Sequence, residues 1–202
     1  MSITHVFFDI GGVLGSNGWD APMRAAAAAE FTLDPEDFAE RHEEAVGSFE
    51  QGRMSLDEYL DATVFYRPRP FSRDAFRAFM FAQSVPYPDT IRFARSLERS
   101  GRYRLMTLNN ESQDLNVHRV QQFGLVGIFT TFFSSCWVGV LKPSRRIYEL
   151  ALAMSQADAG CSVLVDDRER NLEPARALGM QGVLFTGVPA LARDLAALGV
   201  TP

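Results

Sequence analysis

The sequence predicts an α/β protein in which a parallel sheet is covered by helices and a small all-helical unit is inserted after the first strand. Three observations predict this class. Short apolar stretches alternate with amphipathic helical stretches from residue 86 onward, which is typical of parallel sheets. Residues 16–85 carry helical patterns alone. A chain of 202 residues, 47% of them hydrophobic, suffices for one substantial core with a small insert.

The first predicted strand begins near Val6 and ends on a single carboxylate, Asp9, after which the chain turns at Gly11 and Gly12. Ligands bind beyond the carboxyl ends of parallel strands, so this carboxylate is expected to face a crevice. The two glycines permit φ > 0 and a close approach of the backbone to an ion or phosphate. Taken alone, Asp9 fits the cap of a turn or helix equally well.

Four helices are predicted within residues 16–85. Asp20 and Pro22 open the first, the segment after Leu33 opens the second, Ser55 begins a capping box for the third, and Ser72 begins the fourth. The second helix has one mainly apolar face, formed by Phe38, His42, Ala45 and Phe49. The insert ends at a proline-rich turn, residues 85–88. We therefore expect a core of residues 1–15 and 86–202 and a helical cap of residues 16–85.

Strands and helices alternate through the rest of the chain. The predicted strands are 105–110, 128–134, 139–142, 162–167 and 182–185. The predicted helices are 89–100, 113–123, 147–154, 172–178 and 189–198. Right-handed crossovers are expected to join the parallel strands.

Three of these strands end in polar residues: the first in the pair Asn109 and Asn110, the next in Lys142, and the third in the pair of acids Asp166 and Asp167. The carboxyl ends of parallel strands share one edge of a sheet, so these groups are expected near the first carboxylate. Adjacent carboxylates repel each other unless a cation lies between them, which favours a metal site.

The four segments Asp-Ile-Gly-Gly-Val, Leu-Asn-Asn, Lys-Pro and Asp-Asp, in this order, resemble the motifs of the haloacid dehalogenase-like hydrolase superfamily. The resemblance covers nearly the whole chain. It implies a Rossmann-like core with a helical cap, Mg²⁺ as cofactor, and a small phosphorylated metabolite as substrate. It also implies that the first Asp attacks phosphorus and forms an aspartyl-phosphate, which splits one hard displacement into two easier steps.

Carried over by position, the resemblance gives each motif residue a role. The catalytic residues would be Asp9, Asn109 and Lys142. The metal ligands would be Asp9, the carbonyl of Gly11, Asp166 and Asp167. Gly12, Asn110 and Trp19 would contact the substrate, and Asn171 would orient Asp167 or Lys142.

Two positions depart from the phosphatase pattern. Asn109 stands where relatives more often carry Ser or Thr, although an amide can still donate to a phosphoryl oxygen. Gly11 replaces the usual second Asp, the general acid and base. We therefore expect a preference for good leaving groups, such as a sugar 1-phosphate, an acyl phosphate or an aryl phosphate. Asp20 and Glu111 are the nearest other proton carriers in the sequence.

Two alternatives stay open. A 2-haloacid dehalogenase would use the same Asp to attack carbon without a metal, but the paired acids speak against that chemistry. A catalytically weak member that binds a phosphorylated ligand or a protein is favoured by Gly11 and Asn109 and disfavoured by the retained Asp9 and Lys142.

Composition and charge exclude several other classes. The formal net charge of −5 and a pI near 5.2, without a Lys/Arg cluster, exclude a nucleic-acid partner. The lack of a long apolar run or a leader excludes a membrane role, and we expect a cytoplasmic monomer or homodimer. Cys136 and Cys161 are predicted as buried free thiols, and the histidines, His5, His42 and His118, as structural or surface residues.

Overall fold

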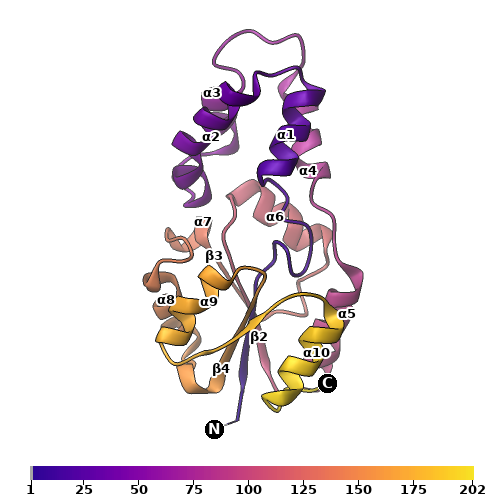
Figure 1. The fold of residues 1–202 in the computed structure, drawn as a ribbon, viewed down its shortest axis with the longest axis vertical. Helices are drawn as coiled ribbons and strands as arrows, with labels where there is room; N and C mark the ends of the chain where they lie inside the picture. Colours follow the sequence, from indigo (N-terminus) through magenta and orange to yellow (C-terminus); the bar gives the residue numbers. More distant parts are fainter. Residues whose placement is uncertain (1) are drawn as a thin grey trace.

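The computed structural model describes residues 2–202 and contains a five-stranded parallel sheet (Figure 1). Its strands are β1 (His5–Phe8), β2 (Arg104–Asn109), β3 (Thr131–Ser134), β4 (Ser162–Asp166) and β5 (Gln181–Leu184). The order across the sheet is β3-β2-β1-β4-β5, and every neighbouring pair is parallel. The strand order therefore reverses between β1 and β4, and such a switch point opens a crevice at the carboxyl ends of the two strands.

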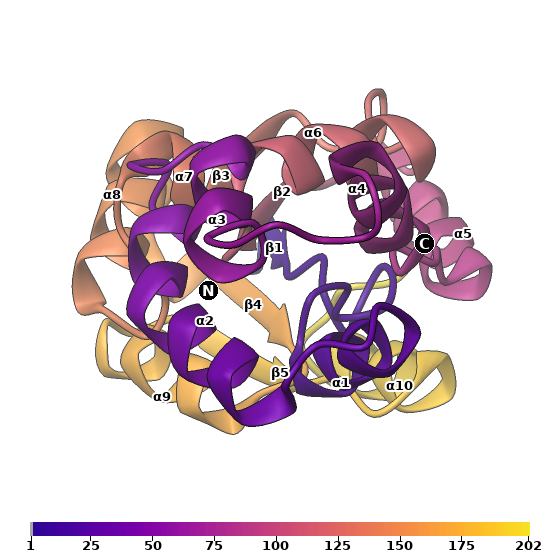
Figure 2. The same ribbon diagram turned by 90° about the horizontal axis from the view of Figure 1, so that it is seen from above.

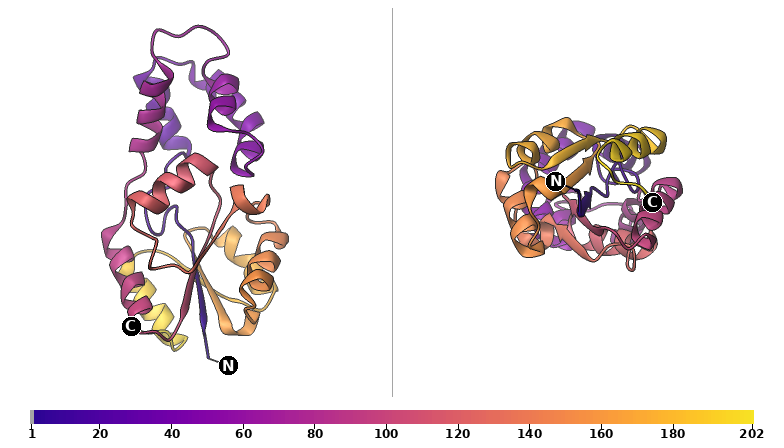
Figure 3. Two further views of the ribbon diagram at one scale, coloured as in Figure 1. Left: turned by 180° about the vertical axis from the view of Figure 1, so that it is seen from behind. Right: turned by 90° about the horizontal axis from the view of Figure 1, so that it is seen from below.

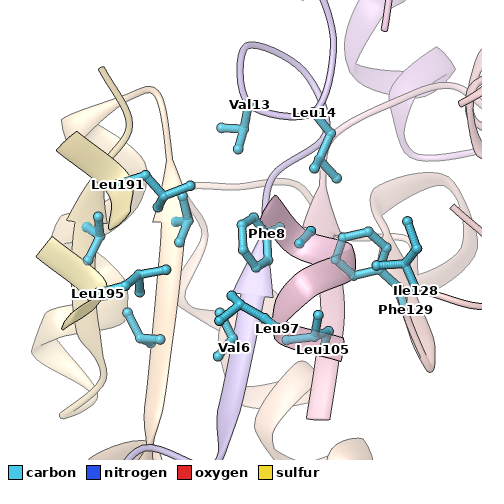
Figure 4. Packing of buried hydrophobic residues seen from close by; sticks show 14 of the residues in the cluster. Val6, Phe8, Val13, Leu14, Leu97, Leu105, Ile128, Phe129, Leu191 and Leu195 are labelled. Carbon is cyan, nitrogen blue, oxygen red and sulfur yellow. The ribbon is translucent and has the colours of Figure 1, made fainter. Parts of the chain in front are cut away.

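Helices cover both faces of this sheet, as the front and back views show (Figures 1 and 3). One face carries α5 (Pro88–Arg99) and α10 (Val188–Ala197), and the other carries α8 (Arg145–Ser155) and α9 (Glu169–Ala177). Side chains alternate along β1, so Val6 and Phe8 pack under α5 and α10 while Phe7 packs under α8 and α9. Figure 4 shows the first of these clusters. The predicted α/β fold is thus confirmed.

Four helices stand beyond the carboxyl ends of the strands (Figures 1 and 2). They are α1 (Ala21–Glu30), α2 (Pro35–Glu50), α3 (Leu56–Thr63) and α4 (Arg73–Ala82). Asp34 caps α2 through the amides of Glu36 and Asp37, and the capping box of Ser55 and Glu58 opens α3. Their apolar faces form a cluster of their own, which Leu115 of α6 (Gln113–Gln122) joins from below. This packing supports the proposal that residues 16–85 form a cap.

The two segments that connect these helices to the rest of the chain lie side by side. The Ser16 amide donates to the carbonyl of Val85 at 2.8 Å, and the Ser16 hydroxyl donates to the carbonyl of Gln83 at 2.6 Å. The amide of Tyr87 donates to the carbonyl of Leu14 at 2.9 Å. The chain therefore leaves the sheet region and returns to it at one place.

One strand prediction is wrong: residues 139–142 form no strand. They follow a short helix, α7 (Ser135–Val138), which Gly139 ends with a φ of +72°. The backbone of Lys142 pairs with the side-chain amide of Asn110 rather than with a neighbouring strand. A further difference is Cys161, in the 3₁₀ turn Ala159–Cys161, which is half-buried rather than buried. Within residues 2–202, no helix combines the length and the apolarity that a membrane span requires.

Candidate functional site

A cavity of about 480 Å³ lies between the carboxyl ends of the strands and the helices α1 and α2. Residues from both sides line it. From the sheet side these are Asp9, Gly11, Asn110, Glu111, Arg119, Lys142, Arg168, Arg170 and Asn171. From the segment containing α1 and α2 they are Asn17, Trp19, Asp20, Ala21, Pro22, Arg24, His42, Glu43, Val46 and Glu50. The switch point of the sheet is thus the floor of this cavity.

Lys142 holds two strand ends together at this floor. Its ammonium nitrogen lies 3.0 Å from an oxygen of Asp9, at the end of β1, and 2.6 Å from an oxygen of Asp166, at the end of β4. The three side chains are buried, so water screens their charges little. A buried cation between two carboxylates fixes their positions.

These buried charges shift one another's pKa values. Burial raises the pKa of Asp9, Lys142 offsets part of that rise, and the charge of Asp166 adds to it. Burial by itself lowers the pKa of Lys142, but the carboxylates of Asp9 and Asp166 raise it by more. Lys142 therefore stays charged, whereas burial brings the pKa of Asp9 to about 7, and further positive charge close by would favour its charged form.

The two acids at the end of β4 differ in what they contact. Asp166 is saturated: it accepts from the ammonium of Lys142, from the amide of Arg168 at 2.9 Å, and from the Asn171 side chain at 2.9 and 3.1 Å. Asp167 has one buried oxygen, Oδ1, without a hydrogen-bond partner among residues 2–202. Asn171 thus orients Asp166, rather than Asp167 or Lys142 as predicted.

Asp9, Asp166 and Asp167 each place a carboxylate oxygen within 4.8 Å of the others. Gly12 makes this cluster possible, because a Cβ at Gly12 would lie 2.2 Å from Asp167 Oδ2, and its φ is +75°. Its amide donates to the carbonyl of Gly15 at 2.7 Å, so this group is engaged within the turn instead of being free for a substrate.

The two asparagines after β2 turn in different directions. The Asn109 side chain is buried, donates to Asn116 at 3.0 Å and accepts from Ser134 at 2.9 Å, and it does not line the cavity. This differs from the predicted hydrogen bond between Asn109 and a phosphoryl oxygen. Asn110 lines the cavity and clamps the backbone of Lys142 through hydrogen bonds of 2.8 and 2.9 Å. Asn110 thus positions the lysine.

Three further residues considered in the sequence analysis, Trp19, Asp20 and Glu111, also line the cavity. Trp19 lines the cavity, but its indole ring packs against Phe38 and Phe76 and donates to Tyr59. Asp20 lines the cavity and has one buried carboxylate oxygen without a partner in residues 2–202. Glu111 pairs with the guanidinium of Arg119, whose nitrogen lies 3.3 Å from the carboxylate.

Several groups at the cavity had no predicted functional role, among them His42 and Glu50 of α2 and Arg119 of α6. His42 carries a sequence signal, since it falls on the mainly apolar face of its helix and is buried there. Glu50 is the last residue of α2, and nothing in its sequence neighbourhood marks it. Arg119 is a charged residue within a surface-type helical pattern, and the structure buries it to 2% exposure.

Two curated proteins give the scale of the sequence similarity. The chain is 30% identical over 132 residues to bifunctional epoxide hydrolase 2 of Rattus norvegicus, an alignment covering 63% of this chain and 24% of that protein. It is 27% identical over 200 residues to drimenol cyclase drtB of Aspergillus calidoustus, covering 96% of this chain and 36% of that protein. The chain thus spans about a quarter to a third of the length of these relatives.

Solved structures with TM-scores of 0.77, 0.77 and 0.62 share the fold at 20%, 19% and 17% identity. The first is a HAD-like family hydrolase from Porphyromonas gingivalis, with 96% of this chain and 98% of that chain covered. The second is a HAD family enzyme from Bacteroides thetaiotaomicron, complexed with magnesium and inorganic phosphate (91% and 94%). The third is L-2-haloacid dehalogenase from Xanthobacter autotrophicus with chloropropionic acid covalently bound (99% and 85%).

The model of the haloacid dehalogenase-like hydrolase family matches residues 3–179, which include β1, β2, β4 and every strand-end residue of the cavity floor. This chain therefore belongs to the haloacid dehalogenase-like hydrolase family.

Proposed function

We propose that this protein is a Mg²⁺-dependent phosphatase of a small phosphorylated metabolite, which acts through an aspartyl-phosphate on Asp9. The observation that carries the proposal is the cluster of Asp9, Asp166 and Asp167 beside Lys142. Lys142 and the guanidinium of Arg168, 3.9 Å from Asp167, together carry two positive charges against three carboxylates, so the cluster favours a further cation. The complex of a HAD family enzyme from Bacteroides thetaiotaomicron with magnesium and inorganic phosphate supports the same choice of ion and ligand.

The residues at the cluster fit a hard divalent cation. Asp167 Oδ1 is a buried acceptor that receives no hydrogen bond from residues 2–202, since Arg168 Nε lies 3.9 Å away, and an oxygen-liganded ion would satisfy it. Asp9, Asp167 and the carbonyl of Gly11 would hold Mg²⁺, whereas the oxygens of Asp166 are already engaged by Lys142 and Asn171. When bound, Mg²⁺ supplies positive charge to the transferring phosphoryl group.

The side chains at the floor of the cavity would then have separate roles in the reaction. One Asp9 oxygen attacks phosphorus while the bond from phosphorus to the leaving oxygen breaks, and the leaving oxygen takes a proton. Lys142 lies within contact of the attacking carboxylate and neutralises charge that develops on the phosphoryl oxygens. Water then cleaves the phosphorus–oxygen bond to Asp9 and restores the carboxylate.

A panel of phosphate monoesters tests this function. We expect phosphate release with Mg²⁺ and none with EDTA, with aryl and sugar 1-phosphates turned over faster than simple alkyl phosphates. An Asp9→Asn preparation sets the background. A parallel assay for halide release from 2-haloacids tests the dehalogenase alternative, and metal-free halide release would replace our proposal by that one.

A replacement for the proton carrier missing at Gly11 follows from the cavity lining. Ser135 ties the end of α2 to the loop after β2, because its hydroxyl donates to the Glu50 carbonyl at 2.6 Å and accepts from the Glu111 amide at 3.0 Å. Glu50 is thus fixed at the cavity. Burial and then the charge of Glu111 raise its pKa to about 7, against smaller opposing effects of Arg168, Arg24 and Lys142. At neutral pH, Glu50 is therefore half protonated and can serve as the general acid.

The variant Glu50→Gln is expected to lower kcat for alkyl phosphates by about 10²–10⁴-fold and to affect aryl phosphates far less. Because the protonated form is the active one, the intact enzyme should lose alkyl phosphatase activity as the pH rises through 7, and the variant should lack this dependence. Glu43→Gln, which also changes a cavity residue, is the matched control. A large loss in Asp20→Asn with normal rates in Glu50→Gln would assign the proton to Asp20 instead.

A further inference from the structure

Three buried side chains of the helical segment form a hydrogen-bonded chain that ends at the cavity. The indole nitrogen of Trp19 donates to the hydroxyl of Tyr59 at 2.9 Å, and that hydroxyl lies 2.8 Å from Nδ1 of His42. Their exposed fractions are 7%, 0% and 4%. His42 lines the cavity, whereas Tyr59 lies behind it.

The donor and acceptor capacities of these groups fix where the hydrogens lie. An indole N–H can only donate, so the oxygen of Tyr59 must accept from Trp19. Burial raises the pKa of Tyr59, so the phenol keeps its one hydrogen. Nδ1 of His42 lies at hydrogen-bond distance, 2.8 Å, and is the acceptor best placed for that hydrogen; the Thr63 hydroxyl, also near the phenol, donates its own hydrogen to the Tyr59 carbonyl. Nδ1 is therefore unprotonated, and the neutral ring must carry its hydrogen on Nε2.

We propose that His42 selects the substrate: its Nε2–H points into the cavity and donates a hydrogen bond to an oxygen on the organic part of the substrate. Nε2 has no hydrogen-bond partner among residues 2–202, and it is not sealed from solvent. Since Nδ1 is held by Tyr59, Nε2 is the ring nitrogen left to face the cavity.

The surroundings of His42 make it a neutral donor and not a cation. Burial and then the nearby charge of Arg24 lower its pKa to about 4. A neutral ring has little attraction for the phosphoryl group, which Lys142 and the metal cluster already serve. Its donor instead matches a hydroxyl or carbonyl oxygen. We therefore expect the substrate to be a hydroxyl-bearing or carbonyl-bearing phosphate ester, which rests on the proposed phosphatase function.

The test combines ring NMR with kinetics. Long-range ¹H–¹⁵N spectra of the intact protein at neutral pH should show His42 with hydrogen on Nε2, exchanging with water because it faces the cavity. Tyr59→Phe should give a mixture of the two tautomers. An Nδ1–H ring, or an Nε2–H fully protected from exchange, would overturn the proposal, and this result does not depend on finding a substrate.

The kinetic arm compares a hexose 1-phosphate with phenyl phosphate, whose organic part has no acceptor beyond the ester oxygen. We expect His42→Leu to raise KM for the sugar ester by about 3- to 10-fold, with KM for phenyl phosphate unchanged. His42→Gln, which keeps a donor near Nε2, should restore much of the difference. Equal changes for the two esters would contradict the proposal. Absence of turnover of both would contradict the proposed function, and the NMR result would still decide the state of His42.

Discussion

Asp9→Asn is expected to reduce phosphatase turnover to the uncatalysed background. An amide is a poor nucleophile and cannot form the acyl phosphate, so the covalent route is closed. The variant should still fold, because Lys142 keeps its pair with Asp166 at 2.6 Å and the Asn side-chain oxygen can accept from the Ile10 amide, which lies 2.8 Å from Asp9 Oδ1. Steady-state rates of the purified variant with Mg²⁺ and the fastest ester of the panel measure the effect.

The matched control is Asp89→Asn, which alters an aspartate whose side chain is 73% exposed at the start of α5 and should leave the rate unchanged. Mass spectrometry of acid-quenched reactions should find phosphate on Asp9 in the intact enzyme and none in the variant. A full rate in Asp9→Asn would show that a contaminating phosphatase was measured or that another group attacks phosphorus.

Arg119→Met is expected to lower the free energy of unfolding by about 3–5 kcal/mol, the usual cost of removing one partner of a buried ion pair. Arg119 contacts Glu111 at 3.3 Å and also donates to Ser84 Oγ at 3.2 Å and to the Ser16 carbonyl at 3.1 Å. Its loss leaves a buried carboxylate without its cation and removes one hydrogen bond to each of the two connecting segments. Urea denaturation followed by circular dichroism measures the change.

The deficit of this variant should depend on pH. Burial raises the pKa of Glu111 and Arg119 offsets part of that rise, so removing the arginine moves the folded pKa further above the unfolded value. The unfolded value is the same for both proteins, so the deficit opens once the pH exceeds the folded pKa of Glu111 in the intact protein, which burial holds above its usual value. Below that pH only the loss of the hydrogen bonds to Ser84 and Ser16 should remain, and the variant should fall furthest behind the intact protein at higher pH.

Two further variants separate the ion pair from simple packing loss. Adding Glu111→Gln to Arg119→Met should restore part of the stability, because no unpaired charge remains. Arg145→Met, which removes an exposed pair with Glu149, should change stability by about 0.5 kcal/mol or less. Equal stability of the intact protein and Arg119→Met would contradict this assignment.

The strand ends were predictable because parallel strands end on a common edge. That rule alone brings Asp9 near Asp166 and Asp167, although Lys142 reaches them from a turn and not from a strand. Side-chain direction was harder to predict. Asn109 is the last residue of β2 and faces away from the cavity, toward Asn116, while its neighbour lines it.

The cavity lining that α2 contributes, including His42 and Glu50, could not be predicted from motifs. His42 and Glu50 reach it because of the way α2 packs over the sheet edge, and that packing depends on contacts far apart in sequence, such as the bond from Ser135 to the Glu50 carbonyl. A histidine on an apolar helical face gives the pattern of a core residue. Only the structure shows that Tyr59 contacts Nδ1, which leaves Nε2 without a hydrogen-bond partner among residues 2–202.

The adjacent connecting segments have a consequence for how this fold tolerates its insertion. Because Ser16 is hydrogen-bonded to Gln83 and Val85, the helices between them span no distance along the sheet. For the remainder of the chain they are equivalent to a hairpin connection, and each doubling of loop length adds only about 0.6 kcal/mol to the entropy of closure. Helical segments of other lengths could thus be exchanged at this junction with little effect on the sheet. The same strand-end cluster could then be combined with inserted segments that differ in the residues they place over it.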